Sequence, residues 1–202
     1  MPARAYRSQR RQSGSAATKE RIVAAVRDLL EEGVFHESTV EEVAERAGVS
    51  RATLYQHFGS RLELIDAICD TMGANPELLR IREVVELPDP DEALVETIAG
   101  SARFWASEDG LLSQLYGVVA VDPAAERFVE RQWNDRRGEL ERLVRHLRKA
   151  GRLRKGLGES RALALLLLLT SYDTFRELRR AGLSDRELVK TLQESAHETL
   201  LG

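Results

Sequence analysis

The stretch "VAERAGVSRATLYQHFGS", residues 43–60, interrupts an amphipathic helical pattern with a glycine at position 48. Before the glycine, small and branched apolar residues recur at the spacing of a buried helix face. After it, Ser50 is a typical N-cap residue, and Leu54 and Phe58 continue an apolar face at i, i+4 spacing. Because a glycine reaches positive φ without strain, we predict two short helices that cross steeply at Gly48.

The sequence on either side supplies the other helices of a small helical unit. Residues 18–33 carry an apolar stripe that ends at a glycine. Thr39 followed by Glu42 is a capping box that starts the second helix. Ser60 followed by Glu63 repeats this signal at the start of a fourth helix. The short third helix is therefore expected to project from a helical support.

The third helix leaves a chemically mixed set of side chains for solvent: Arg51, Thr53, Tyr55, Gln56 and His57. A short projecting helix fits the DNA major groove, where arginine pairs with guanine and glutamine with adenine. Hydroxyl and imidazole groups suit phosphate oxygens. The alternative is the ordinary polar face of a helical hairpin. The combination of a tight turn, a cap and exposed donors favours binding to double-stranded DNA.

The segment from Thr18 to Ile65, with "TVEEVAERAGVSRATLYQHFGSRLELI" at its centre, resembles the helix-turn-helix of TetR-type transcriptional regulators. The shared features are the capped second helix, Ala-Gly-Val-Ser at the turn, Tyr-x-His-Phe in the third helix and a basic residue soon after it. The rest of the chain matches that family in length, helicity and order of elements only. The resemblance implies a transcriptional regulator with a DNA-binding domain at its N-terminal end.

The resemblance also implies roles for individual residues. Phosphates would be held by Thr39, Thr53, Tyr55 and His57, and by Arg61 in place of a lysine that is frequent in the family. Base edges would be read by Arg51, Ala52 and Gln56, and the cap residue Ser50 is included among the candidate DNA contacts. Glu41 departs from the pattern, because its position is often polar or basic in relatives. Its carboxylate would repel a nearby phosphate.

Beyond residue 73 the sequence predicts longer helices. The pairs Asn75-Pro76, Asp89-Pro90 and Asp122-Pro123 each combine a capping side chain with a proline suited to the first helical position. A further capping box starts at Ser184. The expected helices cover residues 77–87, 91–107, 111–121, 123–150, 159–181 and 184–201.

The predicted fold is therefore all-α, with an N-terminal three-helix helix-turn-helix DNA-binding domain followed by a larger helical ligand-binding and dimerisation domain. The expected limits are a flexible basic arm at 1–17, the DNA-binding domain at 18–60 and the second domain at 61–202. The whole chain carries 30 Lys and Arg against 33 Asp and Glu, a net charge of −3, but its first 21 residues are strongly basic. The arm is interpreted as phosphate-seeking, and an ordinary solubilising tail is the alternative.

A homodimer is expected because one helix-turn-helix contacts too little base surface to select a site. The helix expected at 159–181 is apolar almost all round between Ala162 and Leu169, which suits a helix buried against both its own core and a twofold mate. The alternative is the central helix of a monomeric core. The candidate interface residues are Leu165, Leu166, Leu169, Leu188, Leu192 and Ala196.

A hydrophobic small-molecule effector is expected mainly from the resemblance. Aromatic side chains with a polar edge suit a cavity that holds and orients an apolar ligand, although a plain core would use the same residues. The candidate ligand-binding residues are Phe104, Trp105, Tyr116, Phe128, Trp133, Tyr172 and Phe175. We expect the helix that starts at Ser60 to transmit a conformational change from this cavity to the DNA-binding helices when a ligand binds.

The sequence offers no pattern for catalysis, so an enzyme is not expected. It has no Gly-rich phosphate loop, nucleophile elbow or paired-cysteine motif, and Glu194 with His197 is its one Glu-x-x-His spacing. We expect no catalytic residue, metal or cofactor. A DNA-binding or chromosome-organising protein without a ligand remains the alternative function. Repression is expected because a dimer bound across a promoter would block polymerase. Transcriptional activation is the alternative.

The cellular location follows from two further features. The single cysteine, Cys69, cannot form an intrachain disulfide, which fits a reducing cytoplasm. The longest apolar run, residues 162–170, is far shorter than the roughly 20 residues that span a bilayer. We therefore expect a cytoplasmic protein with no membrane partner.

Overall fold

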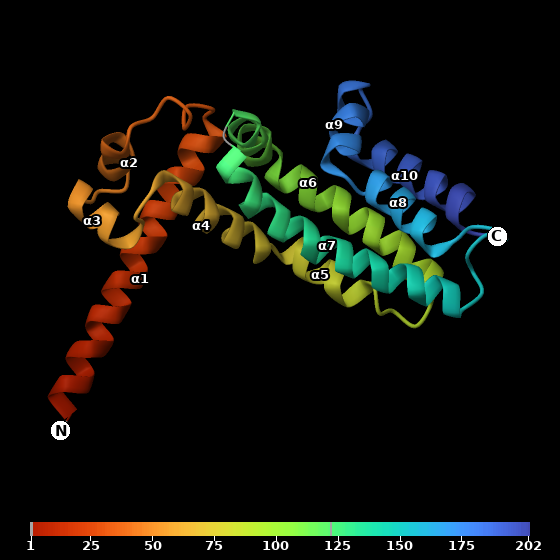
Figure 1. Ribbon diagram of the computed structural model, residues 1–202, viewed down its shortest axis with the longest axis horizontal. Helices are drawn as coiled ribbons and strands as arrows, with labels where there is room; N and C mark the ends of the chain where they lie inside the picture. The colour runs from red at the N-terminus through yellow and green to blue at the C-terminus, as the bar shows by residue number, and fades with distance from the viewer. Residues whose placement is uncertain (1, 122) are drawn as a thin grey trace. The chain divides into compact units, whose positions relative to one another are not determined.

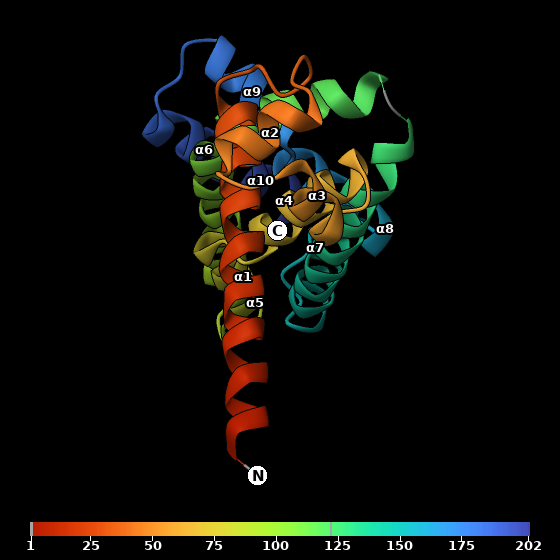
Figure 2. The same ribbon diagram turned by 90° about the vertical axis from the view of Figure 1, so that its left-hand side faces the viewer.

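The computed structural model describes the backbone of residues 2–121 and 123–202 and the side chains of residues 14–118 and 134–202. Over this backbone the chain forms ten helices, and its one extended pairing is an isolated antiparallel bridge between Leu153 and Leu201 (Figures 1 and 2). The all-α prediction is confirmed. The chain divides into two compact units: unit 1 contains Met1–Thr71 and Gly110–Val129, and unit 2 contains Met72–Asp109 and Glu130–Gly202.

Unit 1 contains the four N-terminal helices: α1 (Pro2–Glu31), α2 (Val40–Arg46), α3 (Arg51–His57) and most of α4 (Arg61–Gly73). Helix α2 packs against α1, and α3 packs against α2 (Figure 1). The predicted apolar stripe of α1 forms the core, because Ile22, Val26 and Leu30 are fully buried. Ile68 of α4 is also fully buried. This core supports the two short helices on which the predicted DNA contacts lie.

Helix α1 begins earlier than the sequence indicates. It starts at Pro2 rather than near Thr18, so its backbone includes most of the segment 1–17. The helix passes through Gly14, whose carbonyl accepts a hydrogen bond from the Thr18 hydroxyl at 2.9 Å. Extending an existing helix needs no new nucleation, which favours continuation through a polar segment. The flexibility of residues 1–17 stays a prediction, and the side chains of Arg4, Arg7, Arg10 and Arg11 lie outside the described residues.

Unit 2 contains the longer helices. They are α5 (Pro76–Val84), α6 (Pro90–Val121) up to Asp109, α7 (Pro123–Lys149) from Glu130, α8 (Glu159–Leu169), α9 (Tyr172–Arg180) and α10 (Asp185–Leu200). Helices α8 and α9 both pack against α10 (Figure 1). The predicted capping box of α10 is present, with the Ser184 hydroxyl and the Glu187 carboxylate each accepting from the other's backbone N–H.

Two helices predicted at 91–107 and 111–121 form the single helix α6. The prediction left residues 108–110 between two helices, but Gly110 is not among the glycines with positive φ. Leu111, Leu112 and Leu115 continue the buried face of the helix beyond it. A glycine inside a helix costs about 1 kcal/mol relative to alanine. Burial of three leucines outweighs that cost, so the helix continues.

The single helix predicted at 159–181 is instead divided into α8 and α9. Ser171 caps α9 by accepting a hydrogen bond from the Thr174 N–H at 3.1 Å. The Thr170 carbonyl accepts a hydrogen bond from the Trp105 indole Nε1 at 2.9 Å. That donor comes from α6, 65 positions away in the sequence. A long-range contact therefore stabilises a break that the local apolar pattern concealed.

Candidate DNA-binding surface

The start of α2 is held by the predicted capping box. The Glu42 N–H donates to the Thr39 hydroxyl at 3.2 Å, and the Thr39 N–H donates to the Glu42 carboxylate at 2.6 Å. The backbone and side-chain hydrogen bonds from Thr39 lower the pKa of Glu42 below its usual range. Thr39 remains exposed. Its hydroxyl also donates to the Glu42 carboxylate at 3.0 Å, so the capping box holds the Thr39 side chain, and a phosphate contact by Thr39 stays a prediction.

The turn between α2 and α3 depends on Gly48, whose φ is +64°. The Gly48 N–H donates to the Glu45 carbonyl at 3.0 Å, and the Val49 N–H donates to the Ala44 carbonyl at 2.9 Å. These bonds close α2 in the manner of a glycine C-cap. The predicted turn at Gly48, with its positive φ, is confirmed.

Helix α3 begins immediately after this turn. The Ser50 hydroxyl accepts from the Thr53 N–H at 3.0 Å and lies 2.8 Å from the Thr53 hydroxyl. Leu54 and Phe58 are buried, at 1% and 3% exposure, and attach the helix to unit 1. The outward residues are the exposed Arg51, Ala52, Tyr55 and Gln56, with Thr53 and His57 half-buried. The structure therefore brings the predicted α3 contacts together on one short helix.

Arg51 has two partners within the protein. Its guanidinium forms an ion pair with Glu41, in the first turn of α2. It also lies over the Tyr55 ring, 5.5 Å from the ring centroid. The pKa of Arg51 is raised. The largest cause is hydrogen bonding with the Tyr55 side chain, and the negative charge of Glu41 is the next. Sequence reasoning treated Glu41 only as a repulsive charge, because nothing in a spacing of ten residues indicates that it meets Arg51.

Arg61 is half-buried, and its side chain contacts the loop between α1 and α2. Its guanidinium donates to the Ser38 carbonyl at 2.5 Å and to the Phe35 carbonyl, and it lies 4.0 Å from the centre of the Phe35 ring. Burial lowers the pKa of Arg61. The phosphate contact implied by the resemblance stays a prediction. The observed role of the side chain is to join α4 to the loop before α2.

The sequence of this region matches the family described as "Bacterial regulatory proteins, tetR family" over residues 22–68. The HTH-type transcriptional regulator YdeS of Bacillus subtilis (strain 168) is 30% identical over 158 residues, and the match covers 74% of each chain. The chain belongs to the TetR family of bacterial transcriptional regulators. The HTH-type regulator UidR of Escherichia coli (strain K12) is 32% identical over 87 residues, 43% of this chain and 44% of UidR.

The fold agrees with that membership. The TetR-family regulator PfmR from Thermus thermophilus has the same fold, with a TM-score of 0.66 over 88% of this chain and 91% of PfmR at 18% identity. The TetR-family chain is thus a DNA-binding transcriptional regulator and not an enzyme. Its described residues contain no helix long and apolar enough to span a bilayer. They also bring together no cluster of three or more His, Cys, Asp or Glu that would hold a metal ion.

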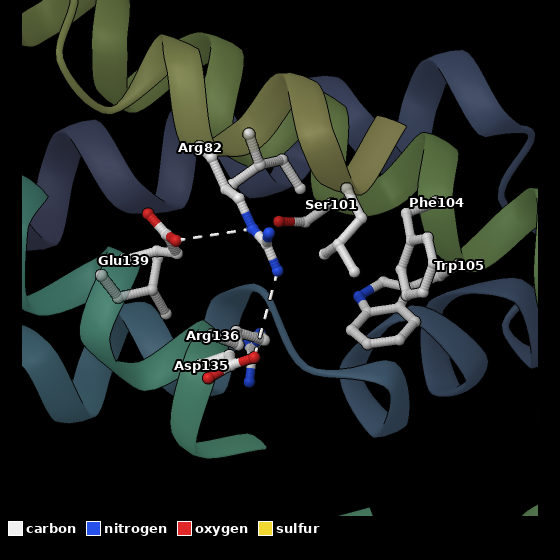
Figure 3. A pocket seen from close by; sticks show the side chains of 10 residues that line it. Arg82, Ser101, Phe104, Trp105, Asp135, Arg136 and Glu139 are labelled. Atoms are coloured by element: carbon white, nitrogen blue, oxygen red, sulfur yellow. Dashed lines mark ion pairs between the residues drawn. The ribbon is translucent and has the colours of Figure 1, made fainter. Parts of the chain in front are cut away.

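Unit 2 of the TetR-family protein contains a small cavity of about 30 Å³ (Figure 3). Its apolar wall includes the predicted residues Phe104 and Trp105, together with Ile81. Arg82 of α5 lies between Glu139 and Asp135 of α7, at 3.7 and 4.0 Å from their carboxylates. The full lining is Leu78, Ile81, Arg82, Ser101, Phe104, Trp105, Asp135, Arg136, Glu139 and Leu140.

Three other predicted ligand-binding residues, Tyr116, Tyr172 and Phe175, have described side chains and do not line this cavity. Tyr172 and Phe175 are buried next to it, where Tyr172 lies 5.6 Å from Trp105 and 6.2 Å from Phe175 between ring centroids. The Tyr172 hydroxyl donates to the Asp109 carboxylate at 2.5 Å. Tyr116 belongs to unit 1. The side chains of Phe128 and Trp133 lie outside the described residues. The sequence did not predict Arg82, Asp135 and Glu139 in the lining, because charged residues do not indicate a cavity.

The predicted interface residues divide into two groups. Leu166, Leu188, Leu192 and Ala196 are buried inside the protomer, where α8 packs on α10. Leu165 and Leu169 are half-buried. The outward face of α8 instead includes Ala164 and Leu168, and the exposed fraction of Leu168 is 59%. An interface on this face would consist of the exposed residues, with the buried group forming the core beneath them.

Proposed function

We propose that this TetR-family regulator is a homodimeric repressor that reads a palindromic operator with α3 and releases it when a hydrophobic small molecule binds in unit 2. The observation that carries the proposal is the set of solvent-exposed side chains on α3. Arg51 and Gln56 supply base-reading side chains on an otherwise anchored helix, and Tyr55 and His57 supply phosphate partners beside them.

Selection of bound sequences from random double-stranded DNA tests this reading. The purified full chain should enrich a palindrome whose half-sites lie about one helical turn apart, or a multiple of it. Footprinting on the enriched duplex should then show protection of both half-sites. The double variant Arg51→Ala, Gln56→Ala changes exposed side chains and should fold normally while losing selection. Enrichment without symmetry, or no protected nucleotides, would contradict the proposal.

The homodimer is supported by the outer surface of α8. Arg161, Ala164, Leu165 and Leu168 recur at i, i+3, i+4 and i+7, so they share one face of the helix. Three of the four are apolar, and Leu168 is largely exposed in the protomer. A second copy of the chain would cover this face. Twofold pairing would also match the symmetry of a palindromic operator.

The effector site is supported by the cavity beside Trp105. A volume of about 30 Å³ accommodates only a few water molecules, whereas drug-sized ligands occupy pockets of about 300–1,000 Å³. An effector must therefore enlarge the cavity, and separation of Arg82 from Asp135 and Glu139 provides a route. Both pairs are long, and the Arg82–Asp135 pair is exposed to solvent, so its loss opposes ligand entry only slightly. Helix α4 passes from unit 1 to unit 2 at Met72, and the chain passes between the units again within α6, at Gly110, and within α7, at Glu130.

A thermal-shift screen against hydrophobic small molecules tests the effector site. A stabilising compound should also weaken binding to the selected duplex, and substitution of Ile81 by Trp should abolish both effects by filling the cavity. If no compound shifts the unfolding temperature, the ligand-independent DNA-binding protein becomes the better description. A compound that binds tightly and leaves DNA affinity unchanged would remove the coupling from the proposal.

Repression follows from steric exclusion, because a dimer on a promoter blocks access of polymerase. In vitro transcription from a promoter that carries the selected operator should decrease as protein is added, and recover with effector. An increase in transcript would instead identify an activator. We also propose a cytoplasmic location, because a bacterial regulator must reach the DNA that it controls.

A further inference from the structure

Glu41, Arg51 and Tyr55 form a cluster on the surface proposed to face DNA. Glu41 lies in the first turn of α2 and Arg51 in the first turn of α3, and their side chains form an ion pair. Tyr55 follows one turn later and supplies the ring over which Arg51 lies. All three side chains are well exposed, at 54% for Glu41, 62% for Arg51 and 42% for Tyr55. The cluster is therefore accessible to a partner.

The geometry points to Glu41 as a specificity-determining residue. Through its ion pair, Glu41 orients Arg51 toward a base edge and disfavours a contact between Arg51 and a phosphate. This inference rests on the proposed DNA-reading function. The ion pair makes the Glu41–Arg51 couple neutral overall, so the couple has little net attraction for a DNA backbone. Non-specific binding depends on such net attraction, whereas base readout depends on hydrogen-bond geometry.

The two kinds of DNA contact affect Glu41 differently. A guanidinium has five N–H donors, so Arg51 can donate to O6 and N7 of guanine while other donors still face Glu41. A phosphate bound by Arg51 would lie close to the Glu41 carboxylate and would be repelled by it. Glu41 thus disfavours the sequence-independent contact more than the sequence-dependent one. Tyr55 narrows the positions open to Arg51 further by lying beneath the guanidinium.

A role in folding is a poor explanation for this ion pair. Pairs between exposed side chains contribute little to stability, because solvent screens them and side-chain entropy opposes them. Helix α2 already has its own N-terminal cap in Thr39, and α3 has Ser50. Replacement of Glu41 should therefore change DNA discrimination without changing the fold.

The test compares Glu41→Gln with the wild type on two probes: the duplex enriched by selection and a random-sequence duplex of equal length. Glu41→Gln keeps the shape and removes the charge. Affinity for random DNA should rise about two- to fivefold, with a smaller change on the selected duplex, so that the specificity ratio falls. The salt dependence on random DNA should steepen by up to about one phosphate contact.

Glu45→Gln is the matched control. Glu45 is exposed on the same helix and has no ion pair or side-chain hydrogen bond among the residues whose side chains are described. Its neutralisation removes the same charge near DNA without releasing Arg51. It should therefore leave the specificity ratio unchanged. An equal fall in the ratio for both variants, or equal gains on both probes for Glu41→Gln, would overturn the inference.

A double variant separates positioning of Arg51 from general electrostatics. In an Arg51→Ala background, Glu41→Gln should no longer alter the specificity ratio, because the residue that it positions is absent. A ratio that still falls by the same factor would show that Glu41 acts without Arg51. If the wild type binds the selected and random duplexes equally, the proposed function fails and the inference fails with it. If the wild type discriminates and Glu41→Gln does so equally well, only the inference fails.

Discussion

Arg61 shows, at the scale of a single residue, that a positive charge at a family DNA-binding position can be used inside the protein. Two of its donors bind the Phe35 and Ser38 carbonyls, which belong to the loop before α2. Its guanidinium also covers the Phe35 ring. Removal of the side chain would leave two carbonyls without this donor. Its main effect should therefore be on stability rather than on DNA affinity.

Arg61→Ala should lower the free energy of unfolding by about 1–3 kcal/mol, the usual cost of part-buried acceptors that lose a charged donor. Arg61→Lys keeps one charge-assisted bond and should lose less. Urea denaturation measures both, and binding to random DNA is recorded in parallel. Unchanged stability together with weakened DNA binding would instead support the phosphate role that the resemblance implies.

Two exposed residues of α3 should separate affinity from discrimination. Tyr55→Ala should weaken binding to all duplexes by a similar factor, because a phosphate partner is indifferent to sequence. Arg51→Ala should reduce affinity for the selected duplex about tenfold and relax the preference at one base pair. Titrations against the selected duplex and its single-base variants test both. Equal losses on selected and random DNA for Arg51→Ala would refute its reading role.

The turn between α2 and α3 shows how one backbone angle orients an element. Gly48 has a φ of +64°, which residues with a side chain adopt only with strain. A Cβ there would have its nearest neighbour at 3.6 Å, the end of the Arg21 side chain, which is an ordinary contact. The steric environment therefore tolerates a methyl group, and the backbone angle does not. The direction of α3 depends on this single conformation.

Gly48→Ala should destabilise the protein by about 1–2 kcal/mol and weaken DNA binding further by tilting α3. Gly138→Ala, on α7, is the matched control, because its Cβ would meet nothing within 4 Å and its φ is not positive. That variant should be up to about 1 kcal/mol more stable than the wild type. Thermal and urea unfolding of the two variants check the contrast. Equal effects from both would show that φ is not the controlling factor.

The beginning of α6 is connected to the segment after α7 by a bidentate ion pair. Arg152 donates from Nε to one Asp91 oxygen at 2.9 Å and from Nη2 to the other at 2.5 Å. The hydrogen bonds from Arg152 hold the pKa of Asp91 below its usual value of 3.8. A carboxylate with a depressed pKa in the folded state stabilises the fold above its unfolded pKa. This contribution is lost as the pH falls through the folded pKa.

Asp91→Asn should therefore be less stable than the wild type at neutral pH, and the difference should shrink below about pH 4. Glu42 and Glu187 have lowered pKa values for a different reason, their hydrogen bonds within capping boxes. Some acid sensitivity should consequently remain in the variant. Urea midpoints across this pH range measure the effect. A constant difference between variant and wild type at all pH values would contradict the assignment to Asp91.

At the scale of the whole molecule, the proposed dimer depends on an apolar face that the protomer leaves open. Leu168 is exposed to 59%, more than the other large hydrophobic side chains among the described residues, and it lies on α8, next to α10. The two helices already bury their facing residues against each other. A dimer through their outer surfaces would therefore extend an existing core rather than create a new one.

Leu168→Glu should convert a dimer into a monomer and reduce operator affinity, because a carboxylate in that interface would be buried without a partner. Leu79→Glu, at an exposed leucine of α5, is the control and should remain dimeric. Light scattering coupled to size exclusion measures the mass directly. The wild type should give twice the 22.7 kDa of the chain. A wild type of 22.7 kDa at micromolar concentration would rule out the dimer.

The sequence alone determined the features that arise from interactions between near neighbours. The Thr39–Glu42 box, the Gly48 corner and the Ser50 cap each depend on residues within a few positions of one another, so their spacing could be interpreted directly. The buried face formed by Leu54 and Phe58 follows from helical periodicity in the same way. The all-helical fold and the exposed row of α3 were predictable for this reason.

The tertiary structure alone decided the features that depend on distant residues. Trp105 stabilises the break after α8 across 65 positions, Arg61 reaches Phe35 across 26, and Arg51 meets Glu41 on a different helix. Packing also determined which leucines of α8 are buried and which face outward. Side-chain spacing within one helix carries no information about these partners. They are selected by the way the helices bury their apolar faces, which brings distant polar groups within hydrogen-bonding distance.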